Sequence, residues 1–248
     1  MSRYFIELAY HGKPFSGFQK QPNAMTVQGS VEDAFQTVLR TAIETTTSSR
    51  TDSGVHALQN YLHFDTGISL PNTLAYNANA ILHKDIVIKD ISKVKDDIHS
   101  RFNALSRTYE YIIYQNKNPF LKDVAYFYPF PLDINILHQS AKLFKKNKNF
   151  QSFCKRHVEV THYNCDLLNV SWHEANDHLK FTVTGNRFLR GMVRALVGTS
   201  LQMARGQIKL EQLQSIFDSN DCRNADFSAD AKGLKLIKVE YPQDIFIN

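Results

Sequence analysis

The chain has 248 residues, of which 43% are hydrophobic and 12% aromatic. That composition excludes a disordered protein, and no apolar run approaches the roughly 18 residues of a membrane span. The formal net charge of +5 divides into −1 over residues 1–100 and +6 over residues 101–248, so a polyanion such as a nucleic acid is an expected partner.

Strands and helices alternate along the first hundred residues. Strands are indicated where apolar and polar side chains alternate, and helices where apolar side chains recur every three or four positions. Thr26 is a good N-cap for the first helix. The expected strands cover 3–10, 60–66 and 85–91, and the expected helices cover 27–42 and 72–82. The expected buried helical faces are formed by Val27, Val31, Phe35 and Val38, and by Leu74, Ala78 and Ile81.

The second half of the chain repeats this alternation. The expected strands cover 107–115, 165–175, 178–185 and 234–241, and the expected helices cover 134–146, 186–204 and 210–217. A polar turn at Asn176-Asp177 would join two of these strands into a hairpin. The long helix 186–204 would bury a stripe formed by Phe188, Met192, Ala195, Leu196 and Met203. We therefore expect an α+β protein with two related halves, residues 1–104 and residues 105–248.

Cysteine content and the N-terminal residues indicate a compartment. Three cysteines, an odd number, argue against a disulfide framework and fit a reducing cytosol. The start of the chain does not resemble a signal peptide, because Glu7 and His11 interrupt its apolar residues. We expect a soluble cytoplasmic protein with no membrane segment.

Common catalytic motifs are missing from the sequence, including the P-loop, the dinucleotide fingerprint, the nucleophile elbow and the zinc-protease helix. One metal-like pattern is present: Cys154, His157, His162 and Cys165 have the spacing C-x2-H-x4-H-x2-C. Zinc accepts such ligands. However, the middle spacer is much shorter than usual, and Cys165 opens an apolar strand, where a free cysteine behaves as a small buried hydrophobe. This pattern therefore favours buried structural cysteines over a metal site.

A polar loop with the sequence Arg-Thr-Asp-Ser-Gly, residues 50–54, precedes the strand that ends in HFDT. An Asp in such a loop can cap its own turn, or it can present a carboxylate to a ligand. Three other segments accompany it in order: 10–35, 98–114 and 186–198. Together with residues 48–66, these segments resemble the family of TruA-type tRNA pseudouridine synthases. The resemblance extends from Tyr10 to the closing segment 229–241.

The resemblance implies a fold and a reaction. Members of the family have the pseudouridine synthase fold, in which two similar α+β halves with antiparallel sheets join around a basic RNA-binding cleft. They isomerise uridine to pseudouridine in the anticodon stem-loop of tRNA, at positions 38, 39 and 40. They use no cofactor and no metal, and they are typically homodimers. We therefore expect the anticodon arm of tRNA and a second copy of the chain as partners.

Four residues match functional positions of the family. Asp52 matches the catalytic Asp, and a carboxylate suits a reaction that must break the N1–C1′ bond of uridine. Arg50 matches an Arg that contacts RNA and helps to hold the flipped nucleotide. Tyr109 matches the Tyr that stacks on the target base, and Arg194 matches an Arg that pairs with the catalytic carboxylate. The resemblance leaves open whether Asp52 attacks the sugar, attacks uracil or abstracts a sugar proton.

Each of these residues also has a purely structural interpretation. Asp52 could cap a turn, Tyr109 could pack across strands, and Arg194 could lay its stem along a helix surface. For His56, a structural hydrogen bond is favoured over a role as general base. A solvated helix end is favoured for three lysines, although they could touch phosphate: Lys145, Lys146 and Lys148.

Several positions depart from the family pattern. The family usually has Gly where Ser49 stands, Ala at Ser53, Asp at His11 and Trp at Phe18, and its closing segment has prolines at Asp230-Ala231. Ser49 lies nearest the reacting group, and a residue other than Gly narrows the backbone angles of the loop. Two alternatives to an active isomerase are an RNA-binding protein of the same fold without catalysis, and a zinc-dependent RNA-binding module built on 154–165.

Overall fold

The computed structural model describes residues 1–156, 160–175 and 177–247. Its contacts divide the chain into two compact units. Unit 1 comprises Met1–Leu105 and the segment that begins at Lys235, and unit 2 comprises Ser106–Leu234. The last strand of the chain thus lies in the same unit as the first, whereas from the sequence we expected it in the second half.

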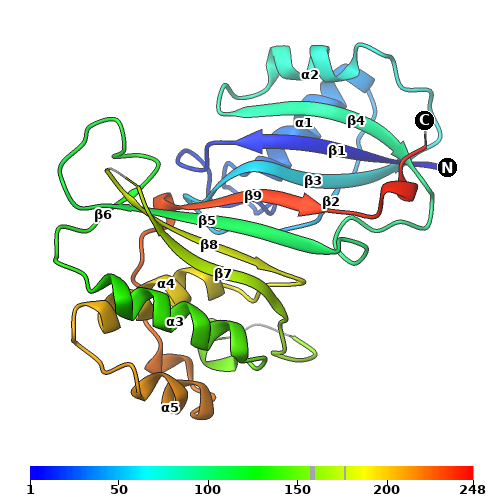
Figure 1. The fold of residues 1–248 in the computed structure, drawn as a ribbon. Helices are drawn as coiled ribbons and strands as arrows, with labels where there is room; N and C mark the ends of the chain where they lie inside the picture. The colour runs from blue at the N-terminus through cyan, green and yellow to red at the C-terminus, as the bar shows by residue number, and fades with distance from the viewer. Residues whose placement is uncertain (157–159, 176, 248) are drawn as a thin grey trace. The chain divides into compact units, whose positions relative to one another are not determined.

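Unit 1 contains a largely antiparallel sheet in the order β4-β1-β3-β9, with the short strand β2 paired to β3 (Figure 1). Strand β1 pairs antiparallel with both β3 and β4, and β9 pairs parallel with the start of β3. The strands are β1 Ser2–Tyr10, β2 Thr46–Thr47, β3 His56–Thr66, β4 Ile86–Val94 and β9 Leu234–Glu240. The helices are α1 Val27–Leu39 and α2 Leu74–Ile81, followed near the C-terminus by a short 3-10 helix, Gln243–Ile245.

Buried side chains of β1 and β3 form the core of unit 1. Phe5, Ile6 and Leu8 of β1 are buried, and Phe64 of β3 lies 5.7 Å, between ring centroids, from Phe35 of α1. Helix α1 packs against α2, and α2 packs against β4. The sheet and its helices together hold the turns at one end of β1 and β3, where the candidate site lies.

Local chemistry explains where α1 begins and ends. The Thr26 hydroxyl accepts a hydrogen bond from the Gly29 amide at 3.2 Å, which confirms the expected N-cap. The helix ends before Arg40, whose φ of +54° is left-handed. Helix α2 buries Leu74 and Ala78 as expected, but Ile81 is 51% exposed because the helix ends at that residue.

Unit 2 contains an antiparallel sheet in the order β5-β8-β7, with the short strand β6 paired parallel to β5. Figure 1 shows helices α3 and α4 beside this sheet, and α3 packs against both β7 and α4. The strands are β5 Ser106–Tyr114, β6 Tyr126–Phe127, β7 Leu167–Glu174 and β8 Leu179–Gly185. The helices are α3 Ile134–Lys146, α4 Met192–Ala204 and α5 Gln212–Asp218, with short 3-10 helices at Gln151–Phe153, Cys222–Asn224 and Ala231–Gly233.

The α+β class with mainly antiparallel sheets is confirmed, and one predicted helix is corrected. We expected a helix over 186–204, but α4 begins at Met192. Gly191 has a φ of +75°, which a right-handed helix cannot contain, so the chain turns there before the helix starts. Phe188 therefore lies in the connection and not on the buried helical stripe. Asn176, in the predicted hairpin turn, lies outside the described residues.

Candidate active site

The loop that carries Arg50 and Asp52 connects β2 to β3 in unit 1. Its side chains alternate in exposure: Ser49 and Thr51 are buried, Arg50 is exposed and Asp52 is half-buried. The turn closes when the Val55 amide donates to the Asp52 carbonyl at 3.1 Å. Between Ser49 and Asp52, buried residues thus alternate with more exposed ones, and Arg50 and Asp52 are the more exposed residues of this stretch.

Buried polar groups lie directly beneath this loop. Asn60 of β3 donates from Nδ2 to the Ser49 carbonyl at 2.9 Å, and its Oδ1 accepts from the Ser48 hydroxyl at 2.8 Å. The Tyr10 hydroxyl of β1 lies 2.8 Å from Thr51 Oγ1. Two neighbouring strands thus hold the inner side of the loop by hydrogen bonds.

The segment 12–18 holds the outer side of the same loop. The Phe18 amide donates to the Thr51 carbonyl at 3.1 Å, and the Ser53 hydroxyl donates to the Phe15 carbonyl at 3.1 Å. Ser53, where the family usually has Ala, therefore adds a hydrogen bond to the loop. Gly17, with a φ of +97°, lets the two backbones approach, since a Cβ atom there would lie 3.2 Å from the Thr51 oxygen.

His56 has a structural role at the end of the loop. It is buried at the first position of β3, and its Nδ1 accepts a hydrogen bond from the Gly12 amide at 3.0 Å. This contact is the structural hydrogen bond that the sequence favoured. The ring of His11, the residue that stands where the family has Asp, lies 4.3 Å from the ring of His56 between centroids and is tilted by 51° against it.

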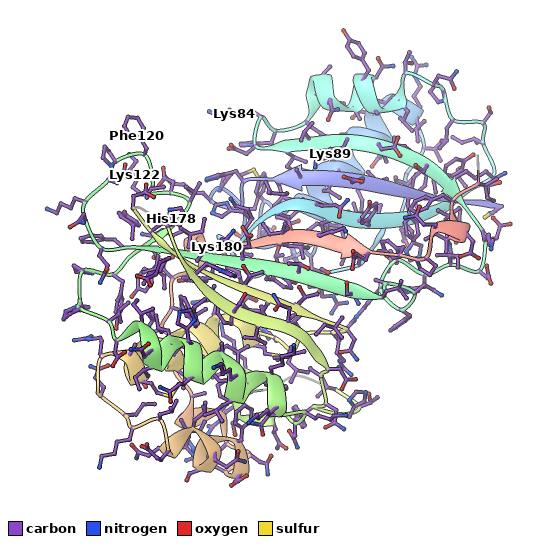
Figure 2. The ribbon with its side chains drawn as sticks, in the orientation of Figure 1. Lys84, Lys89, Phe120, Lys122, His178 and Lys180 are labelled. Carbon is purple, nitrogen blue, oxygen red and sulfur yellow. The ribbon has the colours of Figure 1, made fainter. Side chains whose placement is uncertain are left out.

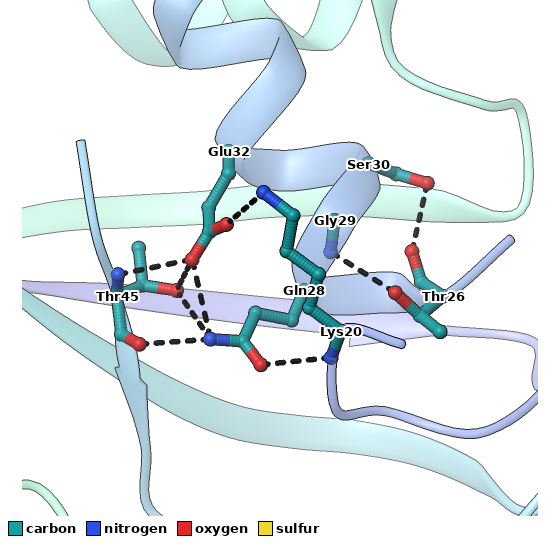
Figure 3. Close-up of polar contacts among 7 residues, drawn as sticks. All are labelled: Lys20, Thr26, Gln28, Gly29, Ser30, Glu32 and Thr45. Atoms are coloured by element: carbon teal, nitrogen blue, oxygen red, sulfur yellow. Dashed lines mark hydrogen bonds and ion pairs between the residues drawn. The ribbon is translucent and has the colours of Figure 1, made fainter. Parts of the chain in front are cut away.

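A carboxylate inside unit 1 fixes the strand segment that leads into the loop (Figure 3). Glu32 Oε1 accepts hydrogen bonds from the Thr45 amide at 3.0 Å, the Thr45 hydroxyl at 2.9 Å and Gln28 Nε2 at 3.2 Å. Glu32 Oε2 pairs with Lys20 Nζ at 2.9 Å, which raises the pKa of the Lys20 ammonium. Helix α1 is thereby tied both to the residue before β2 and to the segment before the helix.

Tyr109 lies in the middle of β5 in unit 2. Its side chain is 8% exposed, and Phe188 meets it edge-on with ring centroids 5.0 Å apart. Across the sheet it is paired with Val183 of β8. The packing fixes the direction of the ring, as a stacking platform requires.

Arg194 lies in the first turn of α4, also in unit 2. Its Nε donates to the Ala229 carbonyl at 2.7 Å, and its Nη2 donates to the Phe227 carbonyl at 3.4 Å. The helix approaches this segment closely, because a Cβ atom at Gly198 would lie 2.3 Å from the Asp226 oxygen. The guanidinium is therefore held by the backbone of 227–229 and is not a freely moving surface group.

Cationic and aromatic side chains occupy connecting segments of both units (Figure 2). In unit 2, Phe120 is 90% exposed between β5 and β6, and the same connection carries the exposed Lys122. The three lysines near the end of α3, Lys145, Lys146 and Lys148, are exposed, as expected. Such groups suit contact with phosphates and unpaired bases.

The Cys/His pattern is only partly described, because His157 lies outside the described residues. Cys154 and Cys165 are buried, and burial raises the pKa of the Cys165 thiol to about 12. His162 faces Arg187, whose Nη1 lies 2.9 Å from His162 Nε2. Within the described ranges, no group of three or more His, Cys, Asp or Glu side chains is arranged to hold a metal ion.

The sequence-predicted residues fall into two sets. Arg50 and Asp52 share one loop of unit 1, and Tyr109 and Arg194 lie on a strand and a helix of unit 2. Sequence reasoning missed three groups that support the loop, namely Tyr10, Glu32 and Asn60. The available signal was a polar side chain on the apolar face of a strand or helix, which needs buried partners.

Comparisons with known proteins give one consistent result. A family model described as tRNA pseudouridine synthase matches residues 8–103 and 141–242. A protein called tRNA pseudouridine synthase A from Parabacteroides distasonis is 38% identical, over 99% of this chain and 98% of its own. Proteins of the same name are 38% identical in Porphyromonas gingivalis, over the whole of both chains, and 34% identical in Staphylococcus aureus, over 96% and 91%. Among the described residues, no helix is long and apolar enough to cross a membrane.

Proposed function

This chain belongs to the tRNA pseudouridine synthase family of isomerases, and on that premise we propose that it converts uridine to pseudouridine in the anticodon stem-loop of tRNA, at positions 38, 39 and 40. The observation that carries the proposal is the anchored loop of unit 1. Its buried residues, Ser49 and Thr51, are held from two sides, and Asp52 follows them directly.

The reaction explains why a fixed carboxylate is needed. The bond between N1 and C1′ must break, uracil must turn over, and a bond from C5 to C1′ must form while the C5 hydrogen leaves as a proton. We propose Asp52 as the catalytic carboxylate that serves this exchange. A rigid loop is suited to the task, because a misplacement of about 1 Å can cost about a hundredfold in rate.

Three further residues are proposed to bind the substrate. Arg50, on the exposed side of the loop, supplies a cation for the RNA backbone and the flipped nucleotide. Tyr109 offers a ring whose direction is fixed by Phe188, and such a platform offsets the stacking that a base loses when it leaves its helix. Arg194 contributes a positioned positive charge for anionic groups of the site.

The assembly and environment follow from the same proposal. We propose that the enzyme acts in the cytoplasm as a homodimer and that it needs neither a cofactor nor a metal. The net charge of +6 over residues 101–248 and the exposed lysines of unit 2 support tRNA as the partner.

The test is release of tritium from 5-tritiated uridine in unmodified tRNA, with EDTA present. Wild type should release tritium, because C5 exchanges its hydrogen for the bond to C1′, whereas Asp52→Asn should release none while binding tRNA with unchanged affinity. Asp33→Asn, at an exposed carboxylate of α1, is the matched control for the same change of charge at the surface. Binding without release by wild type would instead identify an inactive RNA-binding protein of this fold.

A further inference from the structure

We propose that Asn60 is a positioning residue of the isomerase, which acts through Tyr10 and the backbone of Ser49 to fix the loop that carries Arg50 and Asp52. The inference rests on the proposed function and adds a residue outside the Arg-Thr-Asp motif. Asn60 touches the loop and not the substrate, so its effect on the reaction is indirect.

The amide of Asn60 is fully used in a dry environment. The residue is 0% exposed, in the interior of β3. Nδ2 donates to the Ser49 carbonyl at 2.9 Å and to the Tyr10 hydroxyl at 3.3 Å. Oδ1 accepts from the Ser48 hydroxyl at 2.8 Å and from the Tyr61 amide at 2.9 Å. Both hydrogens and both lone pairs of the amide therefore have partners.

Tyr10 extends this connection to the next position of the loop. Its hydroxyl lies 2.8 Å from Thr51 Oγ1, and its ring lies 5.6 Å, between centroids, from the buried Phe18. Asn60 thus reaches the loop directly at Ser49 and through Tyr10 at Thr51. These two positions flank Arg50, and the second one immediately precedes Asp52.

A buried amide at this position is a poorer choice for the stability of the fold than an apolar side chain. A buried polar group costs free energy unless every hydrogen bond is made, and an apolar side chain would suit the core of a sheet without that requirement. What the amide provides is direction: hydrogen bonds fix the loop backbone in one arrangement, whereas apolar packing tolerates several. Asn60 therefore serves the geometry of the loop more than the stability of β3.

Ser49 fits the same interpretation. Among the described residues, the non-glycine residues with positive φ are Asn23, Arg40 and Asn220, so Ser49 takes the position of the family's Gly without left-handed strain. Its carbonyl also accepts from Thr47 Oγ1 at 3.1 Å. Loss of the Asn60 donor should therefore loosen the loop without releasing it completely.

The chain offers a matched control for Asn60. Asn79 of α2 donates from Nδ2 to the Ile88 carbonyl at 2.8 Å, and its Oδ1 accepts from the Ile88 amide at 2.8 Å. It is also an amide bridge between two elements of unit 1, half-buried where Asn60 is fully buried, but it connects α2 to β4 and does not touch the loop. Asn60→Asp and Asn79→Asp each replace the donating NH2 by an acceptor. Tyr10→Phe is a milder variant that keeps the ring and removes only the hydroxyl.

The experiment compares these variants by tritium release at varied tRNA concentration, with thermal unfolding in parallel. Asn60→Asp should lower kcat by about tenfold and Tyr10→Phe by about threefold, with KM within about twofold of wild type, because the loop positions the reacting group and not the bulk of the tRNA. Asn79→Asp should lower the melting temperature but leave kcat unchanged. An equal fall of kcat in Asn79→Asp, or an unchanged kcat in both loop variants, would overturn the proposal.

Hydrogen exchange tests the same idea without activity. Amides of residues 48–55 should exchange about tenfold faster in Asn60→Asp than in wild type, and the same amides should be unaffected in Asn79→Asp. If wild type released no tritium, the proposed function would fail, and this measurement would still decide whether Asn60 orders the loop. Unchanged exchange of 48–55 in Asn60→Asp would refute the positioning role.

Discussion

Removal of the Glu32 carboxylate should destabilise unit 1 by an amount that its contacts define. In Glu32→Ala, the buried Thr45 amide and hydroxyl lose the acceptor that lies 3.0 Å and 2.9 Å away. A hydrogen bond to a charged group contributes about 1.5–3 kcal/mol, and an unpaired buried donor costs about 1–3 kcal/mol. These contributions overlap, because the two describe one loss, so we expect the free energy of unfolding to fall by about 3 kcal/mol.

A second variant separates the hydrogen bonds from the charge. In Glu32→Gln, the carbonyl oxygen can keep the Thr45 and Gln28 donors, and only the pair with Lys20 is lost. The Lys20 side chain is 58% exposed, and an exposed ion pair contributes about 1 kcal/mol or less. Glu32→Gln should therefore cost about 1 kcal/mol, and Lys20→Met should cost the same.

Urea unfolding followed by circular dichroism measures these differences as shifts of the midpoint at constant slope. The urea midpoint should be lowest for Glu32→Ala, higher for Glu32→Gln and highest for wild type. The midpoint of Lys20→Met should equal that of Glu32→Gln. A Gln variant as unstable as the Ala variant would show that the charge of Glu32, and not its hydrogen bonds to Thr45, carries the stability, and the reasoning would be wrong.

Three further predictions concern other groups. Burial, with Arg3 nearby, lowers the pKa of His63 to about 4, so the folded chain binds this proton only at lower pH than the unfolded chain, which binds it near pH 6.5. The free energy of unfolding should therefore fall as the pH drops from 6.5 to 4. Urea titrations at each pH should show a shallower fall for His63→Gln. In Gly12→Ala, the new Cβ would lie 2.0 Å from the Val55 oxygen, so the end of the loop must shift; we expect a loss of about 1–3 kcal/mol in unfolding and at least a tenfold loss of tritium release. Tyr109→Phe should retain most tritium release because its ring still stacks, whereas Tyr109→Ala should lose most of it; equal activities of the two variants would contradict the stacking role.

Periodic patterns predicted the regular elements well. The expected helix 134–146 coincides with α3, because a continuous amphipathic repeat leaves little choice of boundary. The N-cap at Thr26 could also be predicted, because a hydroxyl side chain just before an apolar helical repeat is a local signal. The short strands β2 and β6 could not be found in this way, because two residues carry no period and pair only through the finished sheet.

The residues of the candidate site likewise fall into those that a local motif predicts and those that only the folded structure brings together. A local motif located Asp52 and Arg50 in the sequence, because residues in one loop stay together wherever the fold places them. Asn60 was read only as part of a core strand, since its partners at Tyr10 and Ser49 come from other parts of the chain. Hydrogen bonds between distant segments follow from tertiary packing, and no periodic pattern in the sequence predicts them.

The parallel pairing of β9 with β3 has a consequence for biosynthesis. Unit 2, residues 106–234, is continuous in the chain and can fold as soon as it leaves the ribosome. Unit 1 contains residues 1–105 but also requires the segment from Lys235 onward, which is translated only after the whole of unit 2. The sheet that contains β3, the strand after the Asp52 loop, therefore lacks β9 until unit 2 has been translated. A chain truncated before residue 235 would contain all of unit 2 but would lack the strand that pairs with the start of β3 in unit 1.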